Sequence, residues 1–249
     1  IKSSDVIDVN IKDSLVIIKP ENINIDVVWE DENIAVVNKP SNMLTHPTSS
    51  EQSGTLVNAL LYKYGNNLSD INGELRRGIV HRLDRNTSGL LLIPKNNKTH
   101  EFIADKIKSR EIDKRYLAIV KGIIEEDSFV INQPIGRSLA QPHKMEVNIN
   151  GKESISEVRV IKRFKNATFL EIHLITGRTH QIRVHMSYIG HPVFNDTLYG
   201  FGKMKIKTEE QVLQSYKITF PKPFTKELIT VEIPPDSKIN HVLNYLSSM

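Results

Sequence analysis

The segment that combines the most reactive side chains is residues 78–89, with the sequence GIVHRLDRNTSG. It contains one carboxylate, Asp84, between the guanidinium groups of Arg82 and Arg85, and the imidazole of His81. Opposite charges this close favour the ionised form of a carboxylate, so Asp84 is suited to act as a base or a nucleophile and not as a proton donor. The alternative for a single aspartate in such a segment is a turn cap that accepts backbone hydrogen bonds.

A second segment, residues 176–185, has the sequence TGRTHQIRVH and concentrates cationic and amide donors. Its glycine turn leads into a predicted helix, and the N-terminus of a helix attracts anions such as RNA phosphate or a carboxylate. The side chains that add donors there are Arg178, His180, Gln181 and Arg183. The alternative is a helix start whose arginine pairs with a structural acid.

The hydrophobic pattern predicts the elements that position these two segments. Apolar runs at residues 78–80 and 89–93 predict two buried strands that hold the Asp84 turn at a sheet edge. Further strands are predicted over residues 25–29, 33–40, 113–122, 156–164, 167–175, 215–220 and 227–233, and helices over residues 55–64, 97–110, 179–190 and from Lys238. Asn97 is the predicted cap of the second helix. The fold class is therefore α+β, with a mixed, mostly antiparallel sheet flanked by helices.

The charge is distributed unevenly along the 249 residues. Residues 1–35 hold three lysines and eight acidic residues, whereas the rest of the chain holds 30 Lys or Arg and 21 Asp or Glu. A basic body of this kind favours a polyanionic partner such as nucleic acid.

The composition also excludes several classes of chemistry. The chain has no cysteine, which excludes disulfides, thiol catalysis and cysteine-based metal sites and is compatible with a reducing cytoplasm. No apolar run approaches the roughly 18 residues that a membrane helix requires, so no membrane role is expected.

Three segments together resemble the RluA-type pseudouridine synthases and occur in that family's order. They are HRLD at residues 81–84 with TSG at 87–89, KRYLA at 114–118, and residues 174–185. The resemblance extends from about Val27 to the C-terminus, so residues 21–249 are expected to form a catalytic domain with the pseudouridine synthase fold. Many members begin with an S-four-like RNA-binding module, and residues 1–20 resemble only a remnant of it.

The resemblance implies roles for individual residues. Asp84 corresponds to the catalytic aspartate, Arg183 to the arginine that pairs with it, here expected in a bidentate contact, and Tyr116 to the tyrosine that packs on the target uracil. Arg82 corresponds to the arginine that fills the gap left by a flipped nucleotide. The other expected RNA contacts are His81, Arg85, Lys39, Arg178, His180 and Gln181. For Lys39, a contact with RNA phosphate and a position on a solvated turn are equally expected.

The reaction implied is the isomerisation of uridine to pseudouridine, which involves no redox change, so no metal or organic cofactor is expected. Asp84 could attack the sugar or the base, or deprotonate the sugar to give a glycal. The resemblance is nearest to enzymes of large-subunit ribosomal RNA, although transfer-RNA enzymes share the same segments. A cytoplasmic monomer is expected.

The sequence also suggests three other interpretations. His180, His185 and His191 suggest a metal site, but positions five apart on a helix face different sides. His81, Asp84 and Ser88 suggest a hydrolase triad, yet triads usually join separate chain segments. A non-catalytic RNA-binding or ribosome-assembly protein would be expected to lack Asp84, Arg183 or Tyr116, and all three are present.

Overall fold

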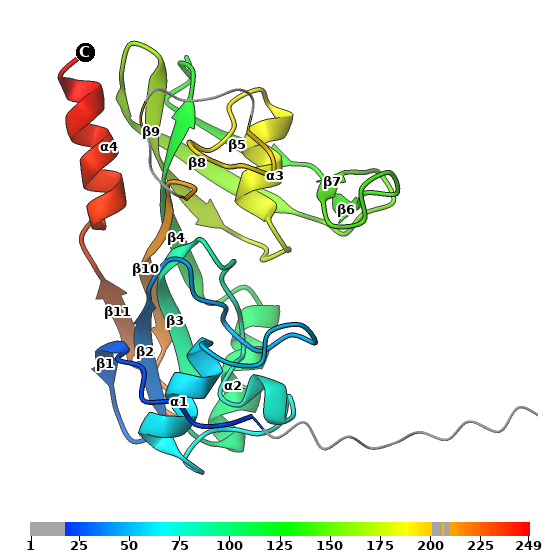
Figure 1. Cartoon of the computed structure of the whole chain (residues 1–249), viewed down its shortest axis with the longest axis vertical. Helices are drawn as coiled ribbons and strands as arrows, with labels where there is room; N and C mark the ends of the chain where they lie inside the picture. The colour runs from blue at the N-terminus through cyan, green and yellow to red at the C-terminus, as the bar shows by residue number, and fades with distance from the viewer. Residues whose placement is uncertain (1–17, 201–205, 207–209) are drawn as a thin grey trace, which may run out of the picture.

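The computed structural model describes residues 18–200, 206 and 210–249 (Figure 1). Most of the module remnant predicted for residues 1–20 therefore lies outside the described residues. In chain order the elements are β1 (Asp26–Glu30), β2 (Ile34–Lys39), α1 (Leu56–Tyr64), the 3-10 helix η1 (Glu74–Arg76), β3 (Ser88–Pro94), α2 (Asn97–Lys108), β4 (Asp113–Lys121), β5 (Ser128–Asn132), β6 (Ile135–Arg137), β7 (Met145–Val147), β8 (Ile155–Arg163), β9 (Ala167–Leu174), α3 (Gln181–Tyr188), β10 (Leu213–Pro221), β11 (Leu228–Glu232) and α4 (Ser237–Ser247).

The main sheet has nine strands in the order β1-β2-β3-β10-β4-β9-β8-β5, with β11 paired to β10. The pairing of β3 with β10 is parallel, and the other described pairs of this sheet are antiparallel. Ser215 of β10 pairs with Gly89 of β3 on one side and with Tyr116 of β4 on the other. This junction brings the loop that precedes β3, which carries Asp84, next to Tyr116.

Helices cover both faces of the sheet. Because side chains alternate along a strand, Val37 and Leu91 pack against α1, whereas Val36 and Leu92 pack with Ile103 of α2. α3 belongs to the same apolar cluster as α1, and α4 packs on β4 and β9 in a separate cluster. Figure 1 shows α3 and α4 on opposite sides of the sheet, with the β6–β7 hairpin projecting on the α3 side. Within the described ranges, no helix is long and apolar enough to cross a membrane.

The predicted mixed, mostly antiparallel sheet with flanking helices is confirmed, but the strand predicted at residues 78–80 is wrong. That segment is irregular, with Ile79 buried. In place of a strand carbonyl, the Nε2 atom of His81 accepts a hydrogen bond from the backbone N–H of Leu92 at 2.9 Å. The apolar run therefore reflects burial alone, and a side chain supplies the acceptor that a neighbouring strand would otherwise provide.

The predicted helix over residues 97–110 forms as α2, but its cap is Asn96 and not Asn97. The Asn96 side chain accepts a hydrogen bond from the backbone N–H of Thr99 at 2.9 Å. The Asn97 side chain instead accepts hydrogen bonds from Ser69 and Asp70. Two adjacent asparagines are both suitable caps, so the sequence alone does not distinguish them.

The junction of β3 and β10 yields a stability prediction. Gly89 has a φ of +115°, and a Cβ atom there would lie 2.0 Å from the carbonyl oxygen of Ser215. We expect Gly89→Ala to lower the free energy of unfolding by about 3 kcal/mol or more, because strain and overpacking add. The measurement is urea unfolding. The control is Gly65→Ala, at a φ of +56° and a ψ of −125° with open space around it, which introduces backbone strain without a steric overlap and should cost less. Equal losses would contradict the steric argument.

Candidate active site

The loop that carries Asp84 is held in place by side chains from residues 39–45. The hydrogen bonds run from Thr45 Oγ1 to the carbonyl oxygen of Leu83 at 2.8 Å, from Lys39 Nζ to that of Arg85 at 3.0 Å, and from Ser41 Oγ to that of Asn86 at 2.8 Å. Because the backbone on both sides of Asp84 is anchored, the carboxylate occupies a defined position before any substrate binds.

Lys39 does not have the role predicted for it. Its side chain is buried, with 0% of the residue exposed, and Nζ also donates to the carbonyl oxygens of Pro40 and Met43, each at 2.8 Å. Burial lowers the pKa of Lys39 to about 7, while the charge of Asp84 opposes this shift. Both an RNA phosphate contact and a solvated turn are therefore wrong. Lys39 is an internal support of the Asp84 loop.

Arg183 on α3 joins Asp84 to a second, buried carboxylate. Its Nη1 atom lies 3.0 Å from Asp84 Oδ2, whereas Nε and Nη2 lie 2.7 and 3.0 Å from the two carboxylate oxygens of Asp196. The ion pair with Asp84 is present, but the predicted bidentate contact with Asp84 is wrong. The two-nitrogen edge of the guanidinium faces Asp196, so Asp84 receives a single donor.

Asp196 is a site residue that the sequence analysis did not identify. Its side chain is 0% exposed, and Oδ1 also accepts the backbone N–H groups of Leu198 and Tyr199 at 3.0 Å. Burial raises the pKa of Asp196, but the Arg183 guanidinium more than offsets this, and the net shift is downward. In the sequence, Asp196 appears only as an aspartate that can accept hydrogen bonds from the backbone N–H groups of the residues that follow it. This turn pattern is common at protein surfaces and does not by itself indicate a functional site.

His180 and Tyr199 complete the surroundings of Arg183. The guanidinium carbon of Arg183 lies 5.0 Å from the centre of the Tyr199 ring. The Tyr199 hydroxyl is 2.7 Å from His180 Nδ1, and His180 Nε2 lies 3.9 Å from Asp84 Oδ2. Burial lowers the pKa of His180 and the charge of Asp84 opposes this shift. The imidazole therefore faces Asp84 directly.

Asp84, His180 and Arg183 line a cleft of about 420 Å³. The predicted residues on its wall are Asp84, Arg183, Tyr116, Arg82, His81, Arg178, His180 and Gln181. Arg85 and Lys39 are not among the lining residues. The structure therefore brings together two segments that lie about a hundred residues apart in the sequence.

Tyr116 lies within the cleft with 6% of its surface exposed. Burial raises the pKa of Tyr116 to about 12, so the phenol is neutral at physiological pH. A neutral aromatic ring in this position offers a flat surface on which a planar base can pack.

Gln181 has a structural role in place of the predicted RNA contact. It is 2% exposed. Its carbonyl oxygen accepts from Thr176 Oγ1 and from the backbone N–H of Arg178, both at 2.9 Å, and its amide nitrogen donates to Ile155 and Ser156 at 3.0 Å. Because protein groups already engage both ends of the amide, the predicted RNA contact is contradicted.

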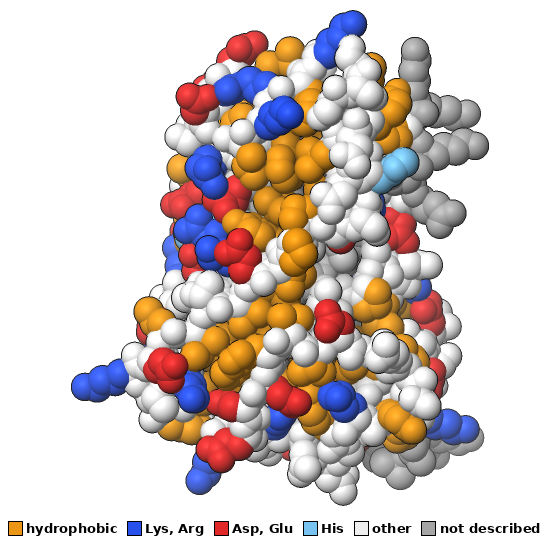
Figure 2. Space-filling model, turned by 90° about the vertical axis from the view of Figure 1, so that its left-hand side faces the viewer, with side chains coloured by type: hydrophobic (Ala, Val, Ile, Leu, Met, Phe, Trp, Pro, Cys, Tyr) orange, Lys and Arg blue, Asp and Glu red, His pale blue; other side chains and the backbone are white. Residues whose placement is uncertain are grey.

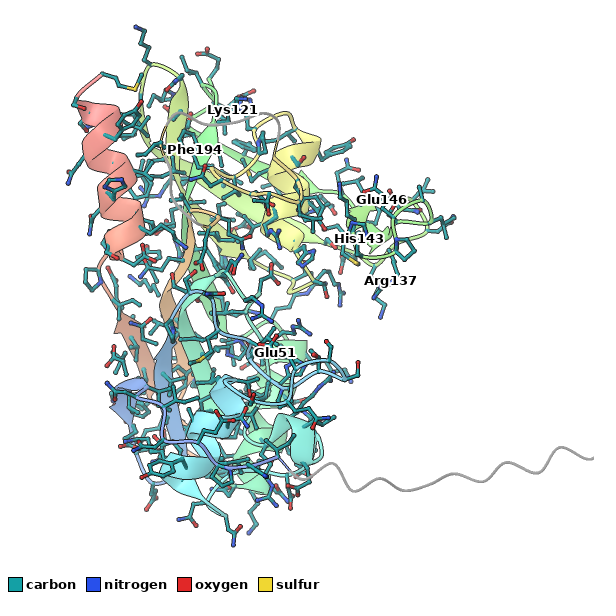
Figure 3. The ribbon with its side chains drawn as sticks, in the orientation of Figure 1. Glu51, Lys121, Arg137, His143, Glu146 and Phe194 are labelled. Atoms are coloured by element: carbon teal, nitrogen blue, oxygen red, sulfur yellow. The ribbon has the colours of Figure 1, made fainter. Side chains whose placement is uncertain are left out.

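The exposed arginines differ in their surroundings. Arg82 and Arg178 are exposed on the cleft wall, and Arg178 Nε donates to the carbonyl oxygen of Glu153. Arg85 forms a two-point ion pair with Glu51, which is labelled in Figure 3. RNA contacts by these three arginines remain predictions.

The three histidines that suggested a metal site have separate partners. His185 is hydrogen-bonded to Ser156 and to the backbone of Gln133, and His191 to the backbone of Lys121. Among the residues that the structure describes, no three His, Cys, Asp or Glu side chains are arranged to hold a metal ion.

The hydrogen bond accepted by His81 leads to a pH prediction. Burial, with a smaller effect of Lys114, lowers the pKa of His81 from 6.5 to about 3. As the pH falls below 6.5 the unfolded chain takes up a proton first, so the free energy of unfolding should fall by about 1.4 kcal/mol per pH unit toward pH 3. Urea unfolding from pH 7 to 4 measures this slope.

His81→Gln retains an acceptor that does not titrate and should remove the contribution of His81, about 1.4 kcal/mol per pH unit, from that slope. The control is His143→Gln on the exposed β6–β7 hairpin (Figure 3), which should leave the wild-type slope in place. An unchanged slope in His81→Gln would show that another group causes the acid loss.

Comparison with known proteins gives the family. Residues 33–188 match the family model described as RNA pseudouridylate synthase. The chain is 40% identical over 238 residues to an uncharacterized RNA pseudouridine synthase of Aquifex aeolicus, covering 92% of this chain and 75% of that protein. It is 38% identical over 232 residues to ribosomal large subunit pseudouridine synthase D of Zymomonas mobilis, covering 89% and 73%.

A solved structure supports the fold. The human RNA pseudouridylate synthase domain containing 1 superposes with a TM-score of 0.71 at 24% identity, covering 91% of this chain and 96% of that chain. The family match and the two relatives agree with the cleft geometry, and the chain belongs to the family of RNA pseudouridine synthases, enzymes that isomerise uridine in RNA.

Proposed function

We propose that this enzyme modifies uridines of large-subunit ribosomal RNA and that Asp84 is its reacting group. The observation that carries the assignment of Asp84 is its position: an anchored carboxylate, 3.0 Å from the Arg183 guanidinium, in the same cleft as the Tyr116 ring. The choice of RNA is supported by relatives named ribosomal large subunit pseudouridine synthase D, at 38% identity in Zymomonas mobilis and 43% in Pseudomonas aeruginosa.

In this proposal each residue of the cleft has a distinct task. Asp84 either attacks the substrate covalently or removes a proton from the sugar while the bond between uracil and ribose breaks. Arg183 keeps the carboxylate oriented through its single Nη1 contact. Tyr116 supports the detached base while it turns. Both chemical routes use the same preorganised carboxylate.

The target nucleotide must leave its stack to reach a cleft of this kind, which costs a few kcal/mol. Contacts to the RNA backbone offset that cost. Arg82 and Lys108 line the cleft, and within the described part of the chain neither forms a hydrogen bond or ion pair. We propose that Arg82 fills the space that the flipped base leaves.

The opposite side of the molecule is less suited to RNA. Figure 2 shows the side on which α4 lies, where hydrophobic side chains form a central band and charges of both signs are mixed around it. Three cations on the sheet face that α4 covers are paired: Arg115 and Arg159 share Glu171, and Lys217 pairs with Glu232. Neutralised cations attract phosphate weakly, so we place the RNA on the cleft side.

A transfer-RNA target is the second candidate, because the catalytic segments are common to both branches of the family. We place the enzyme in the cytoplasm as a monomer, with residues 21–249 as the catalytic domain and residues 1–20 as the end of an RNA-binding module. These assignments rest on the resemblance and on the names of the relatives.

The target and the role of Asp84 are tested together by mapping pseudouridine in ribosomal and transfer RNA. Cells lacking the protein are complemented with the wild type, with Asp84→Asn or with the control Asp105→Asn, on the exposed side of α2. We expect ribosomal sites to disappear and to be restored by the wild type and the control only. Restoration by Asp84→Asn would refute the catalytic assignment, and loss confined to transfer RNA would favour the second candidate.

Arg183→Lys should reduce pseudouridine formation by about 100-fold or more, because one ammonium cannot hold both Asp196 and Asp84 in the geometry of a guanidinium. Single-turnover assays on the identified RNA measure this rate. Arg178→Lys, an exposed arginine of the same segment, should cost far less. Comparable losses in the two variants would mean that cationic charge, and not the fork geometry of Arg183, is what matters.

A further inference from the structure

Lys114 is a buried cation in the cleft with no task in the mechanism described so far. It lies on β4 two residues before Tyr116, so both side chains point to the same face of the sheet. Lys114 is 8% exposed and lines the cleft. In contrast, Arg115 between them points to the other face and pairs with Asp113 and Glu171.

The position of the ammonium group is defined by its neighbours. A Cβ atom built on Gly177, in the segment that follows β9, would lie 3.4 Å from Lys114 Nζ. The charge of Lys114 also contributes to lowering the pKa of His81 on the facing wall. The ammonium group therefore lies between the two segments that form the active site.

Lys114 is unsatisfied within the protein. Among the described residues, no hydrogen bond or ion pair involves its Nζ atom. Lys39 and Arg183 are also buried, but each has several acceptors. An unpaired buried cation destabilises a fold, and burial lowers the pKa of Lys114 accordingly. A ligand that carries negative charge would complete this site.

The depth of Lys114 indicates which part of the RNA it meets. The exposed cations Arg82, Lys108 and Arg178 lie along the cleft and can reach a solvated phosphate. Lys114 lies deeper, beside the ring surface of Tyr116. Residues two apart on a strand are about 6.6 Å apart, which is comparable to the width of a pyrimidine with its carbonyl oxygens. A base on Tyr116 would thus place one carbonyl edge toward Lys114.

We propose that Lys114 donates a hydrogen bond to a carbonyl oxygen of the flipped uracil and stabilises the negative charge that the ring acquires during the reaction. The inference rests on the proposed function of Asp84 and Tyr116 and adds a catalytic residue to it. A preorganised cation directed at developing charge in a buried site is an effective form of transition-state stabilisation.

The electron balance is the same for each route. When the N1–C1′ bond breaks, its electron pair stays with uracil and spreads over N1, O2 and O4. The sugar is balanced either by a bond from Asp84 to C1′ or by loss of the C2′ proton to Asp84. If Asp84 adds to C6 of the base instead, the displaced pair moves toward O4. The ring's electron pair then forms the C5–C1′ bond, which neutralises the ring, while Asp84 leaves C1′ or C6 or returns its proton to C2′. Loss of the proton from C5 and protonation of N1 then give neutral pseudouridine.

The test compares Lys114→Met with the wild type on an RNA that the wild type modifies. We expect the single-turnover rate to fall about 100-fold, while the affinity for RNA changes little and the melting temperature is unchanged or higher, because an unpaired buried charge is removed. The control is Lys98→Met, which removes an exposed positive charge on α2 and should leave the rate unchanged.

Two outcomes would overturn the inference. Weaker RNA binding with an unchanged rate would show that Lys114 holds a phosphate, and a rate loss that follows a lower melting temperature would show a structural role. As a second measurement, cleavage of the glycosidic bond of 5-fluorouridine in the same RNA should be less sensitive to Lys114→Met, because fluorine stabilises the departing anion. Failure of the proposed function is separate: Asp84→Asn would then retain activity, whatever Lys114 does.

Discussion

The ion-pair chain from Asp196 through Arg183 to Asp84 is the interaction on which the active site depends. A buried pair of this kind contributes little net stability, since desolvation offsets much of the attraction. The pair instead fixes the orientation of Arg183. Asp196 binds two nitrogens of the guanidinium, and the remaining nitrogen, Nη1, is directed toward Asp84. A carboxylate positioned in this way, as proposed for Asp84, needs no rearrangement when the substrate arrives.

The sheet supplies the second constraint. The parallel junction of β3 with β10 places the start of β3 beside β4, with Ser215 between Gly89 and Tyr116. Only a glycine allows the backbones to approach so closely, because a Cβ atom at Gly89 would overlap Ser215. The Asp84 loop and Tyr116 are consequently held by the same part of the sheet. Side chains of Lys39, Ser41 and Thr45 anchor the loop further.

The molecule distributes its cations according to their surroundings. On the side of α4, arginines and lysines are neutralised by neighbouring carboxylates. In the cleft, Arg82 and Lys108 are accessible to a phosphate backbone, and Lys114 lies deeper. In the proposed mechanism this arrangement separates two tasks, attraction of a polyanion by the rim cations and stabilisation of charge on a bound base by Lys114. Composition alone reports only the total charge.

The sequence by itself determined the class of fold and the family and predicted the central residues Asp84, Tyr116 and Arg183, because alternating apolar patterns and the spacing around these residues are local properties. Only the tertiary structure decided what each polar side chain does. Lys39 and Gln181 have side chains typical of RNA contacts, but they are buried and other protein groups already bond their polar atoms. Asp196 lies in an ordinary turn pattern yet orients Arg183. Burial and partner choice depend on which distant segments meet, and no local pattern contains that information.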